Sequence, residues 1–599
     1  MDRKSIILLV VCFVLLMLWY PLVVNKLYPP KTLPHGATNA PMATFTATNH
    51  AATSAAPAVV EEPVPAPTAV VGASLPEELL EVTNNRAHYT FTSHGGGLKL
   101  VELLDYPENV AARRAKGSQT TNVATLNSFT PAPTLAVLGG EAVQGDGVFQ
   151  LARTATGVRA EKTLTNGLTI VKDFQLSTNY LVFATVRLEN RTAQPLVLPG
   201  QNWVVGMATP MNNQDDGSAE GLMWSTGAKA QDIVGASFFS SRGFACTQRV
   251  PPSEYRGGLT NVAWAAVHNQ FFALGLAPND PATQVVMWKV DLPRPSEAEI
   301  SADTRTARQP AGYEAALVYP GLTVAPHTNS QRHFIIYAGP KEYRTLANIS
   351  STFGNDLDAI MGYGGFFGFF SKGLLLWMNW LHATVSLPYG WAIIAITVVL
   401  KAVFWPLTAA STRSAKRMQA LQPQIKALQE KYKDDPAKAQ RKMMEFWKEH
   451  KINPMSGCLP MLIQMPVFIG FFYMIRSAIE LRGASFLWVK DLSRPDTLFL
   501  IPGANFPFNL LPLIMGATML WQSHLTPPSP GMDPTQAKMM RYMPLIFLVF
   551  LYNYSSGLAL YWTVNNLLSI LQTKLTRTLQ DSPAPAKAPL LTPGPKKRK

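Results

Sequence analysis

The C-terminal third of the chain is divided into long apolar segments that carry almost no charge, and this pattern restricts the fold more than any other feature. These segments are 389–407, 458–475, 507–524, 539–553 and 556–573. A run of about 20 apolar residues has the length of a membrane-spanning helix. Because hydrophobic residues make up 47% of the sequence and charged residues only 15%, we expect a polytopic α-helical membrane protein.

A sixth apolar run stands near the N-terminus. Residues 5–25 carry no charge, and Arg3 and Lys4 precede them. The run is longer than the hydrophobic region of most signal peptides, and no A-x-A cleavage motif follows it closely. We therefore expect residues 1–28 to form an uncleaved signal-anchor helix, the first of six transmembrane helices, with the basic pair in the cytosol. Residues 29–75 are rich in Pro, Ala and Thr, which predicts a linker.

Residues 76–345 have the pattern of short β-strands. In the segment NYLVFATVRLEN, Tyr180 and Val182 lie on one side of a strand, and Arg187 and Glu189 lie on the other. Similar segments recur between Gly, Pro and Asn turns, without the alternation of strands and helices that marks a parallel sheet. We expect a large antiparallel β-sandwich domain, and a cytosolic N-terminus would place this domain outside the cytosol, in the periplasm.

The chain changes character again after this domain. Residues 356–387 are aromatic and amphipathic, which predicts an interfacial helix. Residues 388–578 are expected to form a core of five transmembrane helices, interrupted by a cytoplasmic helical hairpin at 412–452. This hairpin holds eleven Lys and Arg against five Asp and Glu, and the tail at 579–599 ends in KKRK. The positive-inside rule therefore agrees with cytoplasmic N- and C-termini.

The predicted hairpin allows two interpretations. Its first helix has apolar residues at a spacing of three and four, and Asp435 followed by Pro436 has the form of a helix start. The basic outer faces are either a solvated connector or a docking surface for an acidic or RNA-bearing partner.

Lys401 is a charge deep within one of these apolar segments, where a lipid-facing helix has none. Lys401 follows Thr397 by four residues, so both lie on one face of the expected helix. No carboxylate occurs in the spans to pair with Lys401, which excludes a dry ion pair there. The ammonium either extends to the membrane surface or lies in a water-filled groove open to the cytosol.

Other polar residues are candidates for the walls of such a groove. Gln464 stands between two prolines, and Tyr561 and Trp562 open a polar stripe on the last span. A helix–helix hydrogen bond by Gln464 and ordinary packing of the aromatic pair are the competing interpretations.

The sequence lacks the motifs of common enzymes. It contains no Walker A, H-E-x-x-H, G-x-S-x-G or C-x-x-C pattern, and its three cysteines are far apart. We therefore expect no catalytic residues, no metal site and no cofactor.

Four segments resemble one known family. They are VLKAVFWPLT (399–408), NPMSGCLPMLIQMPVF (453–468), MDPTQAKMMRYMP (532–544) and SSGLALYWTVNNLLSILQ (555–572). These segments look like those of the YidC/Oxa/Alb membrane protein insertases, and the anchor with a large β domain is similar to the Gram-negative bacterial YidC type. The resemblance implies a five-helix insertase core around a hydrophilic groove that opens to the cytosol and to lipid.

The resemblance also assigns residues to this groove. It places Lys401 where the family has an arginine, Thr397 and Gln464 at polar neighbours, and Tyr561 and Trp562 at an aromatic pair. The chain departs from the family pattern at two of these positions. Lys401 replaces an arginine, which keeps the positive charge but loses the planar guanidinium with its paired N–H donors. Trp562 stands where a second tyrosine is common.

The implied function is insertion and folding of membrane proteins in the bacterial inner membrane, alone or with the Sec translocon. The implied partners are nascent membrane proteins, the Sec translocon, the lipid bilayer, and the ribosome through the hairpin and basic tail. A polar-groove transporter or channel is the alternative, and an envelope scaffold that acts through its β domain is a third.

Overall fold

The structure is a computed structural model. It describes residues 75–110, 122–211, 215, 217–241, 249–259, 261–297, 300, 309–432, 435–450, 459–501, 506–525 and 534–578. The predicted anchor at 1–28, the linker up to residue 74 and the basic tail at 579–599 lie outside the described residues.

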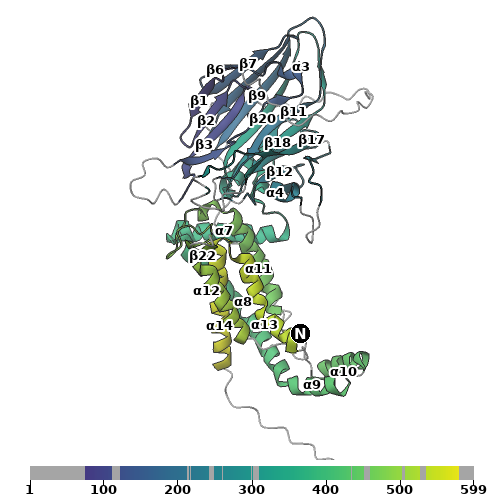
Figure 1. Cartoon of the computed structure of the whole chain (residues 1–599), viewed down its shortest axis with the longest axis vertical. Helices are drawn as coiled ribbons and strands as arrows, with labels where there is room; N and C mark the ends of the chain where they lie inside the picture. Colours follow the sequence, from purple (N-terminus) through teal and green to yellow (C-terminus); the bar gives the residue numbers. More distant parts are fainter. Residues whose placement is uncertain are drawn as a thin grey trace, which may run out of the picture.

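The part of the chain predicted as β forms three antiparallel sheets (Figure 1). The largest has nine strands, in the order β13 (Ala230–Val234), β12 (Gly221–Ser225), β15 (Trp264–His268), β16 (Phe272–Pro278), β20 (Asn329–Pro340), β9 (Leu181–Asn190), β8 (Leu168–Leu176), β7 (Gly157–Thr163) and β6 (Gln150–Arg153). The second has five, in the order β14 (Glu254–Gly257), β17 (Gln284–Asp291), β18 (Ala311–Tyr319), β11 (Gln201–Ala208) and β5 (Val137–Leu138). The third joins β1 (Leu79–Thr83), β2 (Ala87–Thr92), β3 (Gly97–Pro107) and β4 (Val123–Leu126). A two-stranded pair of β10 (Leu196–Leu198) with β19 (Leu322–Val324) completes the domain.

The two larger sheets pack face to face around an apolar core. Strand β9 shows why the sheets pack in this way, because every second side chain faces the core. Val182, Ala184 and Val186 are buried, while the residues between them are partly exposed. Across the interface, Trp203 of β11 stacks on Phe334 of β20 with ring centroids 5.4 Å apart. The antiparallel β domain predicted from the alternating segments is confirmed.

The β domain also encloses a lysine. Lys172 of β8 is fully buried, and its Nζ donates to the carbonyl oxygens of Gly95 at 2.7 Å and Leu135 at 2.8 Å. The ammonium lies 4.5 Å from the ring centroid of Phe149. Burial, together with the nearby charge of Lys162, lowers the pKa of Lys172 to about 7.

Two short elements and one longer helix connect the β domain to the other helices. They are α6 (Tyr343–Phe353), the 3₁₀ turn η5 (Leu357–Met361) and α7 (Gly365–Val385). Helix α7 begins nine residues later than the interfacial helix predicted from 356, because Gly362 takes a left-handed φ of 71° that ends the 3₁₀ turn. In Figure 1, α7 runs across the boundary between the β domain and the other helices.

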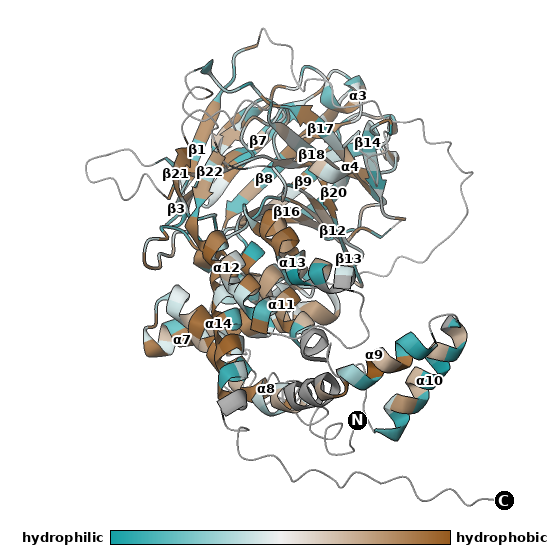
Figure 2. Cartoon of the chain, turned by 60° about the horizontal axis from the view of Figure 1, so that its bottom comes forward, coloured by the Kyte–Doolittle hydropathy of each residue, from teal (hydrophilic) through white to brown (hydrophobic). Residues whose placement is uncertain are grey.

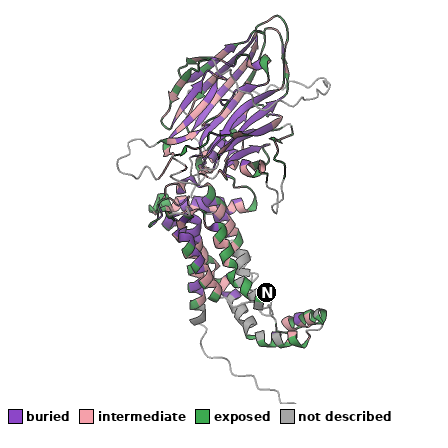
Figure 3. Cartoon of the chain, in the orientation of Figure 1, coloured by how far each residue is buried: buried purple, intermediate pink, exposed green. Residues whose placement is uncertain are grey.

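Five further helices form the lower part of the molecule. They are α8 (Tyr389–Ala420), α11 (Leu459–Ser477), α12 (Leu510–Leu525), α13 (Pro534–Leu551) and α14 (Ser556–Thr578), one for each apolar segment of the sequence. Among the described residues, only the part of α8 from Tyr389 to Ser411 is long and apolar enough on its own to cross a membrane. Many residues of these helices are exposed (Figure 3), and α12 is largely hydrophobic (Figure 2).

A helical hairpin projects from the end of α8 (Figure 1). It consists of α9 (Gln422–Lys431) and α10 (Pro436–Glu449). The predicted start of the second helix is confirmed, since the Asp435 side chain accepts from the backbone N–H of Lys438 at 3.0 Å. The first helix differs from expectation, because α8 continues to Ala420 and the break comes where Pro423 lacks an N–H.

The chain after α11 contacts the β domain. The Arg482 guanidinium donates to the Glu108 carbonyl at 2.9 Å and lies 5.5 Å from the ring centroid of Phe272. The Gln270 side chain donates in return to the carbonyl of Arg476 at 3.0 Å. The end of α11 is therefore the end of the helical region that faces the β domain.

Candidate functional site

Lys401 lies in the middle of the apolar part of α8. It is the 13th of the 23 residues from Tyr389 to Ser411. The ten residues that separate it from Ser411 correspond to about 15 Å of helix, and a lysine side chain covers only part of that distance. Lys401 is half-buried, and its ammonium is directed to a neighbouring helix.

The partner of Lys401 is a serine on the last helix. Lys401 Nζ donates to Ser569 Oγ of α14 at 2.8 Å, and the Ser569 hydroxyl donates to the Asn565 carbonyl at 2.8 Å. None of the five helices contains an Asp or Glu. Thr397 shares the face of Lys401, but it is buried, and its hydroxyl donates to the Ile393 carbonyl of its own helix at 2.7 Å.

A second polar pair joins α11 to α14. The Gln464 side chain donates to the Tyr561 hydroxyl oxygen at 2.7 Å. Tyr561 is buried, and its ring stacks on Phe471 of α11 with centroids 4.1 Å apart. Gln464 therefore makes a helix–helix hydrogen bond, which was one of the two roles considered for it. Its side chain is half-buried and is held by the Tyr561 hydroxyl.

Trp562 faces a different direction from its neighbour. Its ring packs edge to face on Phe468 of α11 at 4.5 Å and lies 5.8 Å from Phe547 of α13. No hydrogen bond of Trp562 is recorded among the described residues. Of the five candidate residues, the structure joins Gln464 to Tyr561, places Thr397 and Lys401 on one face, and turns Trp562 toward apolar packing.

Several polar residues of α14 extend the candidate site. Tyr561, Asn565, Ser569 and Gln572 follow one another at intervals of four, four and three residues, so they line one face of the helix. The Gln572 amide donates to the Thr408 hydroxyl of α8, and the Asn565 side-chain oxygen is buried without a hydrogen-bond partner among the described residues. The spacing in the sequence could have revealed Ser569 and Gln572, which the sequence prediction had not named.

This polar face has an uncommon chemical composition for the inside of a helix bundle. It offers one cation, hydroxyls and amides, and the five helices supply no acid and therefore no internal counter-charge. Among the described residues, no group of His, Cys, Asp and Glu is arranged to hold a metal ion. Such a face suits transient contact with a polar or acidic chain better than tight binding of a small ligand.

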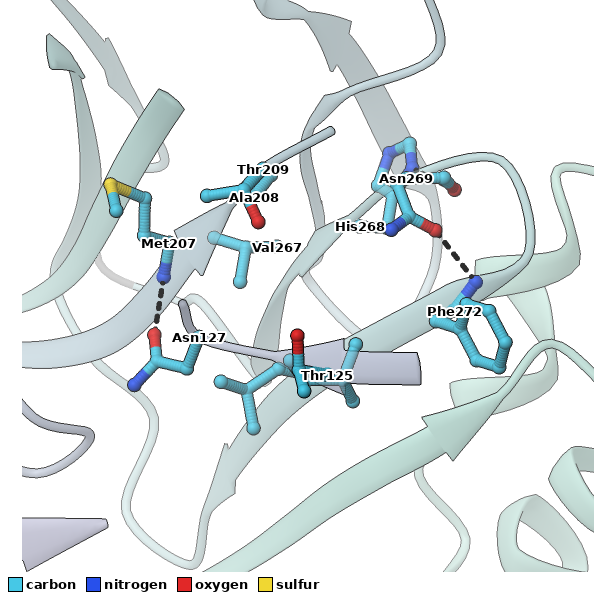
Figure 4. A pocket seen from close by; sticks show the side chains of 11 residues that line it. Thr125, Asn127, Met207, Ala208, Thr209, Val267, His268, Asn269 and Phe272 are labelled. Carbon is cyan, nitrogen blue, oxygen red and sulfur yellow. Dashed lines mark hydrogen bonds between the residues drawn. The ribbon is translucent and has the colours of Figure 1, made fainter. Parts of the chain in front are cut away.

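The β domain contains a small cavity at the edge of its core (Figure 4). Asn127 accepts from the Met207 N–H at 2.8 Å on one side, and Asn269 accepts from the Phe272 N–H at 2.9 Å on the other. Its volume of about 10 Å³ is close to what one water molecule requires, so this cavity cannot hold a substrate.

The fold and the site together define a helical membrane protein with a large antiparallel β domain and a cationic face among its helices. Two family models match the chain. The one described as 60Kd inner membrane protein matches residues 380–582, and the one described as YidC periplasmic domain matches residues 79–377.

Named relatives agree with these matches. The membrane protein insertase YidC of Citrifermentans bemidjiense is 33% identical over 509 residues, which cover 82% of this chain and 84% of the relative. The YidC proteins of Pseudomonas fluorescens Pf-5 and Neisseria gonorrhoeae NCCP11945 are 43% and 42% identical over 254 and 262 residues. These two alignments cover 42% and 43% of this chain and 42% and 45% of the relatives. The chain belongs to the YidC family of membrane protein insertases.

Solved structures give weaker likenesses. A crystal structure of an active YidC insertase with its first transmembrane domain resolved is 21% identical, covers 83% of this chain and 92% of that chain, and has a TM-score of 0.32. A putative aldose 1-epimerase from Escherichia coli K12 is 9% identical, covers 44% of this chain and 99% of that chain, and has a TM-score of 0.27. The assignment rests on the sequence matches.

Family membership fixes the general function and location. The protein is an insertase of the bacterial inner membrane, its substrates are nascent membrane proteins, and the β domain lies in the periplasm. The function is insertion rather than enzymatic catalysis, as the sequence predicted.

Proposed function

We propose that this chain inserts its substrates along a hydrophilic groove that is open to the cytosol and lined by Lys401, Thr397, Gln464, Tyr561 and Trp562. The observation that carries the proposal is the contact of Lys401 with Ser569, since a cation in mid-helix meets a hydroxyl and no acid. Such a charge persists in a bilayer when water reaches it. Ser569 and Asn565 extend the same wall.

The mechanism follows from this charge. The polar leading segment of a nascent chain enters the groove, where Lys401 attracts its acidic residues and the wet walls reduce their desolvation. The apolar segment that follows moves along the lipid-exposed helices. Hydrophobic partition then completes insertion, aided by the membrane potential at about 2.3 kcal/mol per charge per 100 mV.

The proposed topology has six transmembrane helices. An anchor within 1–28 is the first, and α8, α11, α12, α13 and α14 form the five-helix core within 388–578. Both termini are then cytoplasmic, as are the hairpin within 412–452 and the tail at 579–599. A linker at 29–75 leads to a periplasmic domain at 76–345, and α7 supplies the interfacial helix assigned to 356–387.

The cytoplasmic hairpin and tail are the proposed ribosome contacts, since their Lys and Arg residues attract RNA. Along α10, Arg441 and Lys448 are exposed, and Lys442 forms an ion pair with Glu445 at 2.6 Å. The Sec translocon is the proposed partner for substrates that the chain does not insert alone.

The charge of Lys401 can be tested directly. The full chain is reconstituted in proteoliposomes, and insertion of a single-span substrate with an acidic leading segment is measured by protease protection. Lys401→Glu should slow insertion about tenfold or more, which corresponds to about 1.4 kcal/mol of lost attraction. Lys401→Ala should give an intermediate rate, and Lys401→Arg should be tolerated because it keeps the charge.

A substrate with a neutral leading segment is the matched control. Its insertion should change less than twofold or so in all three variants, since no acid meets Lys401. If both Lys401→Ala and Lys401→Glu insert the acidic substrate at the wild-type rate, the electrostatic role is wrong. Crosslinking of stalled nascent chains from position 401 tests the groove itself, and absence of any crosslink there would exclude it.

A further inference from the structure

A two-stranded hairpin precedes α12 and belongs to none of the features above. It consists of β21 (Thr497–Ile501) and β22 (Phe506–Asn509), and α12 begins at the next residue. From Thr497 to residue 532 the sequence contains no Asp, Glu, Lys or Arg. An uncharged hairpin thus continues directly into an uncharged helix.

The hairpin exposes apolar side chains along one face and at its bulge. Leu498 is 46% exposed, Phe499 53% and Phe506 48%. Phe499 and Ile501 are two residues apart and pair with Phe508 and Phe506, so these side chains lie on one face of the ribbon, and Leu498 adds apolar surface at the bulge beside them. A two-stranded ribbon with such surfaces is marginally stable in water and prone to aggregate, so its surroundings must be less polar than water.

The position of the hairpin is fixed by the ends of two helices. The Tyr552 hydroxyl, just after α13, donates to the Pro507 carbonyl at 2.8 Å. The buried Asn509 side chain donates to the Tyr552 carbonyl at 2.9 Å. Phe506 also stacks on the Tyr552 ring with centroids 5.1 Å apart. The hairpin therefore stays at the end of α12 and α13.

This end of the helices is the periplasmic one. The loop that leads from α11 to the hairpin carries Arg482, which contacts the β domain through the Glu108 carbonyl. Since the β domain is periplasmic, β21 and β22 lie at the periplasmic side of the membrane.

The length of α12 indicates what the hairpin contributes. Its 16 residues extend about 24 Å, whereas the hydrocarbon core of a bilayer is about 30 Å thick. The missing length of about 6 Å lies next to the hairpin if the other end of α12 reaches the cytosolic boundary. Apolar side chains of β21 and β22 are the residues in position to cover it.

We propose that the β21–β22 hairpin is embedded in the periplasmic leaflet of the lipid bilayer, at the level where headgroups meet acyl chains, and that it completes the apolar span of α12. The hairpin cannot lie deeper, because the outer edges of a two-stranded ribbon have backbone groups that need water or headgroups as partners. Trp488, which is 37% exposed and donates to Asp496 at 3.0 Å, is suited to the same level.

The test measures depth with a fluorescent label at single cysteines of the full chain in lipid nanodiscs. Cys12, Cys246 and Cys458 are first replaced by serine, and Phe499→Cys and Phe506→Cys are labelled with bimane. Quenching is compared between aqueous iodide, a lipid with a nitroxide at acyl carbon 5, and one with a nitroxide at carbon 12.

Two control positions define the limits of the scale. Val197 of β10 is 77% exposed in the β domain and should respond to iodide alone. Met543 of α13 is 38% exposed, lies about 12 Å along the helix from Leu551, and should respond most to the deep nitroxide.

Labels at 499 and 506 should be quenched most by the shallow nitroxide, and their iodide quenching should be about threefold weaker than at 197. Quenching by iodide to the same degree as at 197, with no response to either lipid, would overturn the proposal and leave a protein partner as the occupant. Quenching most by the deep nitroxide would overturn the interfacial level. Because the readout is depth rather than insertion, it is independent of the role proposed for Lys401.

Discussion

The β domain and the helical region each enclose a lysine, and the two lysines differ in burial and in the number of their hydrogen-bond acceptors. Lys172 in the β domain is fully buried, and two backbone carbonyls, of Gly95 and Leu135, accept from its nitrogen. Lys401 in the helical region is half-buried, and the hydroxyl of Ser569 is its one hydrogen-bond partner among the described residues.

The number of acceptors separates a structural lysine from an available one. A neutral amine has two N–H donors, which the two carbonyls around Lys172 satisfy completely, and with its pKa lowered to about 7 Lys172 is mostly neutral above that pH. An ammonium has three donors, of which Lys401 uses one within the described residues. Lys401 therefore keeps donors for a substrate, and Lys172 keeps none.

The largest expected effect is on the stability of the β domain. Lys172→Ala should lower the free energy of unfolding by about 3 kcal/mol, because two buried carbonyls lose their donors and a cavity forms. The measurement is hydrogen exchange of residues 168–176 in the full chain, read by mass spectrometry. Lys289→Ala, at an exposed lysine of β17, is the control and should change stability by less than about 0.5 kcal/mol. If Lys172→Ala lowers the free energy of unfolding by less than about 1 kcal/mol, Lys172 is not a structural lysine and the contrast with Lys401 is wrong.

A smaller effect is expected from pH. The folded pKa of Lys172 is lowered from 10.5 to about 7, so between these values the unfolded chain binds one more proton than the folded chain. Stability of the β domain should therefore rise with pH, by about 2 kcal/mol from pH 7 to pH 9, and level off above 10.5. Hydrogen exchange measured over this pH range, after correction for the intrinsic pH dependence of the exchange rate, gives the slope of stability against pH. Lys172→Met should abolish it, and an equal slope in that variant would assign the effect to another group.

The smallest expected effect concerns Ser569. Ser569→Ala removes one hydrogen bond between helices, worth about 0.6 kcal/mol. The insertion rate of an acidic substrate should therefore fall about threefold. Thr573→Ala, whose hydroxyl donates within α14 to the Ser569 carbonyl at 2.8 Å, is the control and should insert normally. A loss as large as that of Lys401→Glu would mean that Ser569 contacts the substrate itself.

The helices and the charge of the candidate site could be predicted because they depend on local sequence. Apolar blocks placed all five helices, and Lys401 was recognisable as a cation deep within a block, with no acid in the blocks to pair with it. The antiparallel character of the β domain followed from alternation such as that of β9. These features need no knowledge of which elements are neighbours.

The missed features depend on tertiary contacts. Ser569 contacts Lys401 because α14 packs against α8, and the Trp562 ring faces Phe468 because α14 also packs against α11. The β21–β22 hairpin was not predicted, since PGAN and the prolines around it resemble a loop and the pairing with Tyr552 is not local. Helix α6 was missed because it is short and lies between a strand and a glycine-rich segment.

Pro406 makes α8 easier to bend at one point. It lies inside the helix, five residues after Lys401, and without an N–H it leaves the carbonyl of Ala402 without its usual helical bond. The helix is more compliant at this point than on either side. A bend of α8 is therefore expected at Pro406, beyond the turn that carries Lys401.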